Sequence, residues 1–363
     1  MTLASKFSSS RIYLYTVKTF LISVLFLLFS SSGFSQNSCA EQLANAEKLY
    51  ESGQIDKVAA MLEPCLENGF SKDEKARAYR LLSLCNLYYN EDEEAEKAFL
   101  ELLKAKPEYK IKDSDPSEFV NLYQEFRTVP VFITGIKFGW GFTDIHNIEN
   151  YNDINSVESI GKYDPENAIS VGLSFETPIL KELSVVYELY YHNYSYSFSN
   201  VVLDYANVSF KETVTGVDIP LMLQWNILSE DFVPYVNLGA SLNFLMKSQA
   251  TYTRRDTIGT EYREAVKLND LDLTDSRKTF NYALCAGVGF RWKNIIGPGY
   301  LTFDFRYSRY MNNIVDPEHR ADNSEVLYSF LVADNIFKVQ NTQFLIGYKL
   351  PLYIPKHKKK INK

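Results

Sequence analysis

The stretch Phe280-Asn-Tyr-Ala-Leu-Cys-Ala-Gly-Val-Gly-Phe-Arg-Trp292 decides the fold of this chain. Side chains along a β-strand point alternately to opposite faces, so this stretch predicts a strand with two unlike faces. One face is apolar and rich in aromatic rings: Phe280, Tyr282, Leu284, Ala286, Val288, Phe290 and Trp292. The other is small or polar: Asn281, Ala283, Cys285, Gly287, Gly289 and Arg291. An aromatic outer face with a polar inner face is typical of a closed barrel in an outer membrane.

The same alternation recurs along the second half of the chain and predicts eight strands. Their ranges are Val131–Phe142, Ala168–Thr177, Leu183–Phe198, Phe210–Trp225, Val233–Lys247, Thr279–Trp292, Gly299–Asn312 and Val339–Leu350. The connections after the second, fourth and sixth strands are short, and those after the first, third, fifth and seventh are long and polar. Short periplasmic turns alternating with long surface loops are the outer-membrane pattern. A soluble β-sandwich rich in tyrosine is the alternative that the alternation leaves open.

The composition of the 363 residues excludes two other classes of protein. Hydrophobic residues make up 46% of the chain, and beyond the N-terminus no run approaches twenty apolar residues, which excludes a helical membrane protein there. The net charge of −7 gives no overall basic field that would attract nucleic acid. Aromatic residues reach 15%, with 26 Tyr and 24 Phe, which fits the aromatic girdles of a membrane barrel.

Charged residues occupy several of the inward-facing positions of the predicted strands. Extending the alternation assigns to the lumen Lys137, Glu176, Glu188, His192, Asp218, Arg291, Asp304, Arg306 and Lys349. Eight strands leave a lumen just wide enough for side chains to fill. An unpaired charge in such a dry space is costly, so we expect these groups to pair with one another. The predicted network is structural rather than catalytic, and it argues against an open channel.

The first 35 residues have the features of a secretory signal peptide. Lys6, Arg11 and Lys18 precede the apolar run Phe20–Phe29, which is too short to span a bilayer. Small residues then lead to a predicted cleavage site before Gln36. We therefore expect residues 1–35 to direct export and to be absent from the mature protein.

Residues 36–128 show apolar side chains at helical spacing, arranged as two helix pairs and a closing helix. The second pair resembles a tetratricopeptide repeat: Tyr79 stands at the bulky position, Ala95 and Phe99 at the small and aromatic positions, and Pro107 at the closing proline. The resemblance implies a stack of helical hairpins, a fold that commonly binds partner proteins. Docking of a partner and a purely structural spacer both remain open for this segment.

Three of the four cysteines lie in this helical segment. Cys39 would lie at the start of one helix and Cys65 near the end of the next, and antiparallel helices bring those ends together. Export permits a disulfide, so Cys39–Cys65 is the preferred pair, with three reduced and buried thiols including Cys85 as the alternative. No Cys-x-x-Cys pair or Cys/His metal spacing occurs.

Two runs in the predicted barrel resemble a known family. Gly216–Trp225 contains Asp-Ile-Pro-Leu-Met-Leu, and Pro234–Gly239 reads Pro-Tyr-Val-Asn-Leu-Gly. Both resemble the PorT-type outer-membrane β-barrel domain, which carries an acidic-Ile-Pro-Leu-Leu run on its fourth strand and a Pro-Tyr run on its fifth. The resemblance covers roughly residues 130–350 and implies the fold and the outer-membrane location. It implies little about function, although one class of members serves in assembly of a secretion system.

Two polar segments outside the predicted strands could meet other molecules. Residues 249–278 carry many charges of both signs, and they are either a contact for a partner at the cell surface or a solvated loop. The end of the chain, residues 353–363, is basic and is expected to be a solvated periplasmic tail. The four histidines show no Ser-His-Asp or metal-ligand spacing, so no catalytic site, metal or cofactor is predicted.

The sequence therefore predicts an α + β protein of several domains. A signal peptide (1–35) precedes a periplasmic tetratricopeptide-like helical domain (36–128), an eight-stranded antiparallel transmembrane β-barrel (129–352) in contact with outer-membrane lipid, and the tail. The first hypothesis for function is a non-enzymatic scaffold that docks a periplasmic protein through residues 39–128 in an envelope or secretion assembly. The alternatives are a small transport or ligand-binding barrel and a lipid-modifying barrel enzyme.

Overall fold

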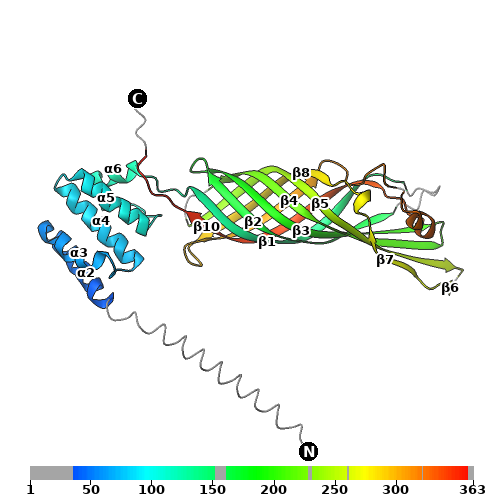
Figure 1. Cartoon of the computed structure of the whole chain (residues 1–363), viewed down its shortest axis with the longest axis horizontal. Helices are drawn as coiled ribbons and strands as arrows, with labels where there is room; N and C mark the ends of the chain where they lie inside the picture. Colours follow the sequence, from blue (N-terminus) through cyan, green and yellow to red (C-terminus); the bar gives the residue numbers. More distant parts are fainter. Residues whose placement is uncertain (1–35, 152–160, 228–230, 260, 321, 359–363) are drawn as a thin grey trace, which may run out of the picture. The chain divides into compact units, whose positions relative to one another are not determined.

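The computed structural model describes residues 36–151, 161–227, 231–259, 261–320 and 322–358, and it divides into two compact units (Figure 1). One unit consists of the helices up to Val129 together with the end of the chain from Ile354, and the other is the sheet Pro130–Tyr353. The predicted signal peptide and residues 359–363 lie outside the described residues. Within the described part of the chain, no helix combines the length and apolar character needed to cross a membrane.

The helical unit contains five α-helices and one short 3-10 turn among its described residues. Their bounds are α2 Gln36–Glu51, η1 Ile55–Lys57, α3 Val58–Leu66, α4 Lys72–Tyr88, α5 Asp92–Ala105 and α6 Ser117–Glu125. The predicted helices are all present. Ser71 starts α4 with a capping box, because its hydroxyl accepts from the Glu74 N–H and the Glu74 carboxylate accepts from the Ser71 N–H. Accordingly, the hydrogen bond from the Ser71 backbone lowers the pKa of Glu74.

Helix α6 begins without a side-chain cap. Pro116 stands at the N-cap and offers no side-chain bond. Asp115 instead accepts the backbone N–H of Lys112 and pairs with Arg80 of α4. Asp115 therefore holds the loop before α6 against the preceding hairpin rather than satisfying the helix end.

Two apolar cores hold the helices together. The first lies among α2, α3 and α4 and centres on Leu43, Val58 and Leu62. The second lies among α4, α5 and α6, where Phe99 and Phe119 meet edge to face with ring centroids 5.4 Å apart. A pair of this geometry adds about 0.5–1.5 kcal/mol to the gain from burial alone.

Cys39 and Cys65 form a disulfide that links α2 to α3, with their Cα atoms 5.8 Å apart and a sequence separation of 26. Cys85 is a buried free thiol, and burial raises its pKa to about 11, so it is a poor nucleophile. The disulfide constrains the unfolded chain, and it therefore stabilises the first of the two cores most directly.

We expect the double variant Cys39→Ala/Cys65→Ala to lose about 3 kcal/mol of stability in the helical unit, from the entropy of a cross-linked loop of this length. The measurement is thermal unfolding of the detergent-solubilised protein, followed by helical circular dichroism. A reductant should lower the transition of the wild type towards that of the variant and leave the variant unchanged. Equal transitions for wild type and variant under oxidising conditions would contradict the expectation.

Eight long strands close into a ring in the second unit. Their bounds are β1 Phe132–Glu149, β2 Lys162–Pro178, β3 Leu183–Val202, β4 Ala206–Asn226, β5 Phe232–Ile258, β8 Phe280–Lys293, β9 Tyr300–Tyr310 and β10 Ile336–Leu352. Each strand pairs antiparallel with its neighbour in the chain order given, β1 pairs with β10, and β4 with β5, so the ring has no open edge. The predicted eight-stranded barrel is thus present, as Figure 1 shows.

The strands run further than predicted at one end of the barrel. In place of the long loop predicted after the third strand, β3 and β4 continue to a tight turn, where Leu203 and Asp204 adopt positive φ. The charged segment 249–278 is also largely strand: β5 extends to Ile258 and pairs with β6 (Glu261–Tyr262) and β7 (Val266–Asp272). These strands exceed the roughly 9–11 residues needed to cross a bilayer, so they continue beyond it.

A β-bulge at Met246 marks where the character of the barrel changes. Thr215 pairs with Lys247 and Gly216 with Leu245, which leaves Met246 as the extra residue and reverses the side-chain alternation of β5. On one side of the bulge the outer face is apolar, as at Leu221 and Leu223 of β4. On the other side the outer face is polar, as along β3 and β4 at Asn193, Ser197, Ser199, Asn207, Ser209 and Lys211.

The polarity of the barrel interior also changes at the bulge, in the opposite direction to that of the outer face. Beside the apolar outer belt the interior carries charges, and beyond the bulge it carries an apolar core that includes Tyr196, Phe198, Phe210, Tyr252 and Phe337. Segments between the last strands fill this core. They include a short π-helix, η3 (Val326–Phe330), whose Phe330 is buried against Tyr252. The same strands thus build two sections of opposite polarity: one is apolar outside and charged inside, and the other is polar outside and apolar inside.

Candidate functional site

The predicted lumen residues all lie on the inner face of the ring and form ion pairs. The carboxylate of Glu176 in β2 forms ion pairs with Arg291 of β8 at 2.7 Å and with Lys349 of β10 at 3.2 Å. Their side chains are buried, with 1% of Glu176, 7% of Arg291 and 2% of Lys349 exposed. β2 and β8 stand four places apart in the ring of eight strands, so the Glu176–Arg291 pair crosses the lumen, whereas β2 and β10 are separated by β1 alone.

A second group of ion pairs lies in the same lumen. Glu188 of β3 contacts Lys137 of β1 at 3.0 Å and Arg306 of β9 at 2.7 Å. Lys137 also reaches Asp304 at 2.8 Å, and the Tyr235 hydroxyl donates to Asp304 at 2.9 Å. Each carboxylate is therefore matched by a base, which is the condition for keeping charges in a dry interior.

The remaining predicted lumen pair is His192 of β3 and Asp218 of β4, with His192 Nδ1 3.0 Å from the Asp218 carboxylate. Next to it, the pairing of β3 with β4 is interrupted where Pro220, which has no N–H, stands in β4. The cavity there, lined in part by Tyr190, Asp218 and Arg306, has a volume of about 10 Å³. That is room for about one water molecule, far from the size of a solute path.

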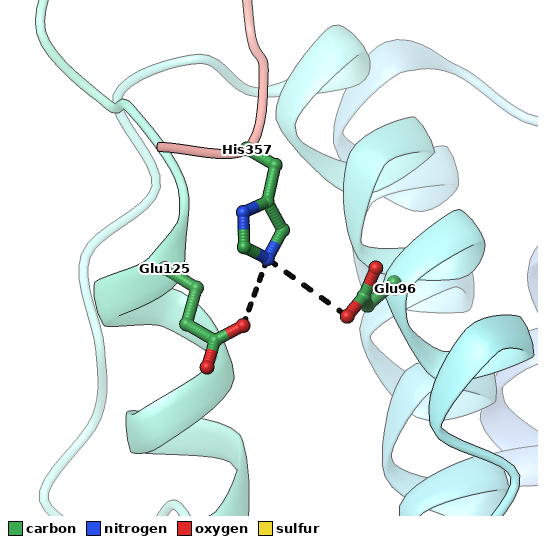
Figure 2. Close-up of side chains that lie close together, drawn as sticks. All are labelled: Glu96, Glu125 and His357. Carbon is green, nitrogen blue, oxygen red and sulfur yellow. Dashed lines mark hydrogen bonds and ion pairs between the residues drawn. The ribbon is translucent and has the colours of Figure 1, made fainter. Parts of the chain in front are cut away.

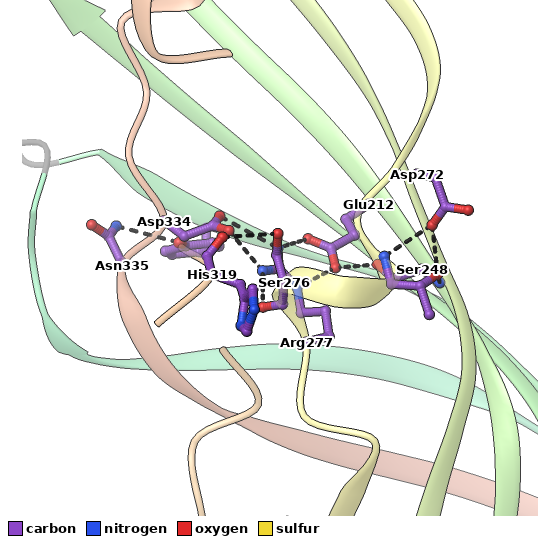
Figure 3. A network of polar contacts seen from close by, with 10 residues as sticks. Glu212, Ser248, Asp272, Ser276, Arg277, His319, Asp334 and Asn335 are labelled. Carbon is purple, nitrogen blue, oxygen red and sulfur yellow. Dashed lines mark hydrogen bonds and ion pairs between the residues drawn. The ribbon is translucent and has the colours of Figure 1, made fainter. Parts of the chain in front are cut away.

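A third charged cluster lies inside the apolar core beyond the bulge, and the sequence analysis missed it (Figure 3). Arg277 reaches Glu212 of β4 and Asp334 of the segment before β10, each at 2.6 Å. Ser248 of β5 also donates to Glu212 at 2.6 Å. The side chains of Arg277 and Glu212 are fully buried. Arg277 is therefore not part of a solvated loop, as its place in the segment 249–278 had suggested.

One signal in the sequence could have found this cluster. Glu212 lies within the predicted fourth strand Phe210–Trp225 and has the same parity as Asp218, so the alternation places Glu212 inside as well. Nothing comparable exists for Arg277 and Asp334, since both lie outside the regular strands and reach the core through the path of their loops.

The exposed histidines of the barrel unit lie apart from the charged clusters of the lumen. His146 lies beside Asp144 on the exposed face of β1. His319 lies 3.5 Å from Asp316 with half of its side chain exposed. The Ser276 hydroxyl donates to the backbone carbonyl of His319 at 3.2 Å, and the imidazole takes no part in that bond.

Residues 123–316, more than half of the chain, match the family described as the outer membrane protein beta-barrel domain. The chain belongs to this family. Membership in this family implies an outer-membrane location, and an apolar outer belt is the typical lipid-facing surface of such barrels. The three tryptophans of the chain, Trp140, Trp225 and Trp292, all lie exposed on this outer face, at 44%, 53% and 47%.

Several solved structures of outer membrane barrels are similar to this chain at low identity. OprG from Pseudomonas aeruginosa has 13% identity and a TM-score of 0.33, with 63% of this chain and 97% of OprG covered. AlkL in lipid bilayers has 11% identity and a TM-score of 0.32, with 70% and 98% covered. Neisserial surface protein A has 10% identity and a TM-score of 0.29, with 61% and 97% covered. No curated protein matches the chain.

The helical unit offers one conspicuous exposed feature at the end of α4. Tyr88 and Tyr89 are 68% and 49% exposed, and their rings meet edge to face at 5.6 Å. Asn90, in the left-handed conformation with φ 58°, then turns the chain into α5. The acidic run Glu91–Glu94 follows directly, so an aromatic pair and a negative charge cluster adjoin on this surface.

Proposed function

We propose that this member of the outer membrane barrel family is a non-enzymatic anchor, whose helical unit lies in the periplasm and docks a protein of an envelope or secretion assembly. The observation that carries the proposal is the filled barrel. Paired charges occupy its membrane belt, an apolar core occupies its extension, and the cavity between them holds about 10 Å³. In this proposal a barrel filled in this way contributes a fixed position in the membrane, and recognition falls to the unit that it carries.

The resemblance of the barrel strands to the PorT type and of α4 and α5 to a tetratricopeptide hairpin supports the same proposal. A tetratricopeptide hairpin commonly binds partner proteins, whereas the PorT resemblance bears on the fold and the location and implies little about function. In this proposal the structural charge network of the lumen serves to keep the barrel rigid and closed. The strand-forming segment 249–278 remains a second candidate contact, facing the cell surface.

The Tyr88–Tyr89 pair is the surface that we propose for docking. Tyrosine offers a large apolar face and a hydroxyl at low cost in conformational entropy, and it is enriched at the energetic centres of protein interfaces. The neighbouring acidic run stabilises the N-terminus of α5, but that role does not need two exposed rings. Together these features fit a partner segment that is basic and carries apolar side chains.

We expect the double variant Tyr88→Ala/Tyr89→Ala to lose its partner, with at least a tenfold drop in recovery, since interface tyrosines contribute about 2 kcal/mol or more. The measurement is quantitative mass spectrometry after gentle purification of the full-length tagged protein from solubilised outer membranes. Tyr328→Ala is the matched control, because Tyr328 is 80% exposed and belongs to the barrel unit. A stoichiometric partner should remain with the control and disappear with the double variant.

Two outcomes would contradict the proposal in different ways. A partner recovered equally with both variants would show that the tyrosine pair is not the docking surface. The transport alternative would be favoured over the anchor if the wild-type protein had no stoichiometric partner and gave stable conductance steps in planar bilayers.

A further inference from the structure

Three side chains from distant parts of the helical unit converge at the end of the chain (Figure 2). His357 Nε2 lies 2.8 Å from a carboxylate oxygen of Glu125 in α6 and 3.9 Å from one of Glu96 in α5. The three potential ligand atoms all lie within 4.8 Å of one another. None of these residues was singled out by the sequence, because the histidine follows the glutamates by more than two hundred positions.

The backbone holds His357 in this place. The segment around it pairs with the end of α6 through an antiparallel bridge between Phe126 and His357. The Arg127 N–H donates to the Lys356 carbonyl at 3.0 Å, and the Lys358 N–H donates to the Glu125 carbonyl at 2.7 Å. The described part of the tail, up to Lys358, is therefore bound to the helical unit, which corrects the prediction of a wholly solvated tail.

The hydrogen bonds of the imidazole ring show which ring nitrogen carries a proton. The other nitrogen then faces the carboxylates with a lone pair. His357 Nδ1 lies 2.9 Å from the Lys358 carbonyl oxygen, which can only accept, so Nδ1 carries a proton. Nε2 then faces an acceptor oxygen of Glu125, and two acceptors this close repel each other unless a cation lies between them. A proton can fill that role, and accordingly the bonds to Lys358 and Glu125 raise the pKa of His357. A metal ion can fill it as well.

We propose that Glu96, Glu125 and His357 bind a divalent transition-metal ion, with zinc as the best fit. Zinc binds imidazole nitrogen and carboxylate oxygen at about 2.0–2.2 Å, which places tetrahedral ligands roughly 3.4 Å apart. The observed separations of 2.8 and 3.9 Å bracket that spacing. In a metal-binding histidine, the ring nitrogen that does not bind the metal usually donates its N–H to an acceptor such as a backbone carbonyl, as Nδ1 of His357 does here. Calcium and magnesium prefer oxygen ligands alone and fit this set less well.

The ion would add a polar link among three elements, of which α5 and α6 already pack through Phe99 and Phe119. Glu96 lies on α5, Glu125 on α6 and His357 on the segment that follows the last barrel strand. A ligand from each would fasten the C-terminal segment to the helices. Water would occupy the remaining coordination position, since the histidine side chain is 35% exposed and the glutamates 44% and 39%.

The test is a zinc titration of the full-length protein in detergent, purified with a tag that contains no histidine and read against a chromophoric chelator. We expect one site, weakened at least about tenfold in His357→Ala, since changes in contacts outside the ligand set already cost 10–100-fold. Glu96→Gln should weaken zinc binding similarly while leaving the backbone bridge between Phe126 and His357 intact. His319→Ala is the control, because it removes an exposed histidine of the barrel unit and should leave the affinity unchanged.

A second readout separates the metal site from a simple ion pair. Zinc should slow proteolytic removal of the C-terminal segment in the wild type and in His319→Ala, and it should have no such effect in Glu96→Gln. Zinc affinity that is equal in the wild type, His357→Ala and Glu96→Gln would overturn the proposal. So would a wild type that binds no zinc.

Discussion

Replacing Arg277 by Met should lower the free energy of unfolding of the barrel by about 3–5 kcal/mol, the usual effect of removing one partner from a buried ion pair. Arg277 meets Glu212 with Nε at 2.7 Å and Nη2 at 2.6 Å, and it meets Asp334 with Nη1 at 2.6 Å. Without the guanidinium, two carboxylates remain inside an apolar core and repel each other. The loss should be largest where segments outside the regular strands fill the barrel.

The measurement is urea unfolding of the refolded protein in detergent, followed by tryptophan fluorescence, together with limited proteolysis of residues 311–335. Arg255→Met is the matched control, because Arg255 is exposed on β5 and its loss should change stability by less than about 1 kcal/mol. Replacing Arg277, Glu212 and Asp334 together by apolar residues of similar volume should recover most of the loss. A single variant as stable as the control would show that water reaches this cluster.

The sequence predicted the barrel well because its main signal is local. Alternation with a period of two places each side chain on a face without any knowledge of the neighbouring strands, so the eight strands and the inward position of residues such as Glu176 and Arg306 followed from parity alone. The prediction that Cys39 and Cys65 lie close together depended only on the antiparallel order of two neighbouring helices. In each case the physical cause and the residues that reveal it lie close together in the chain.

The features that the sequence did not reveal depend on distant parts of the chain. The bulge at Met246 reverses the parity of β5, and its position is set by pairing with β4. The extension of β3 and β4 replaced a predicted loop, because apolar side chains such as Phe198 and Phe210 face inward there while polar ones face outward. The meeting of His357 with α5 and α6 depends on where the last strand ends. No local pattern encodes any of these.

The second large effect is expected at Glu188, and it tests whether the lumen is filled and dry. Glu188→Gln should lower the stability of the barrel by about 3–5 kcal/mol, since Glu188 neutralises both Lys137 at 3.0 Å and Arg306 at 2.7 Å. Lys137 keeps its contact with Asp304, so the uncompensated charge falls mainly on Arg306. The double variant Glu188→Gln/Arg306→Met should therefore be more stable than Glu188→Gln alone.

The control for this prediction is an ion pair on the water-facing surface of the same barrel. Glu166 lies 3.1 Å from Lys211 with 30% of its side chain exposed, and Glu166→Gln should change the free energy of unfolding by less than about 1 kcal/mol. Urea unfolding in detergent measures both variants. If Glu188→Gln costs no more than Glu166→Gln, the lumen charges are hydrated as in an aqueous channel, and the argument for an anchor loses its main support. A cost several times larger means that the charges serve to close the barrel, which leaves recognition to the helical unit.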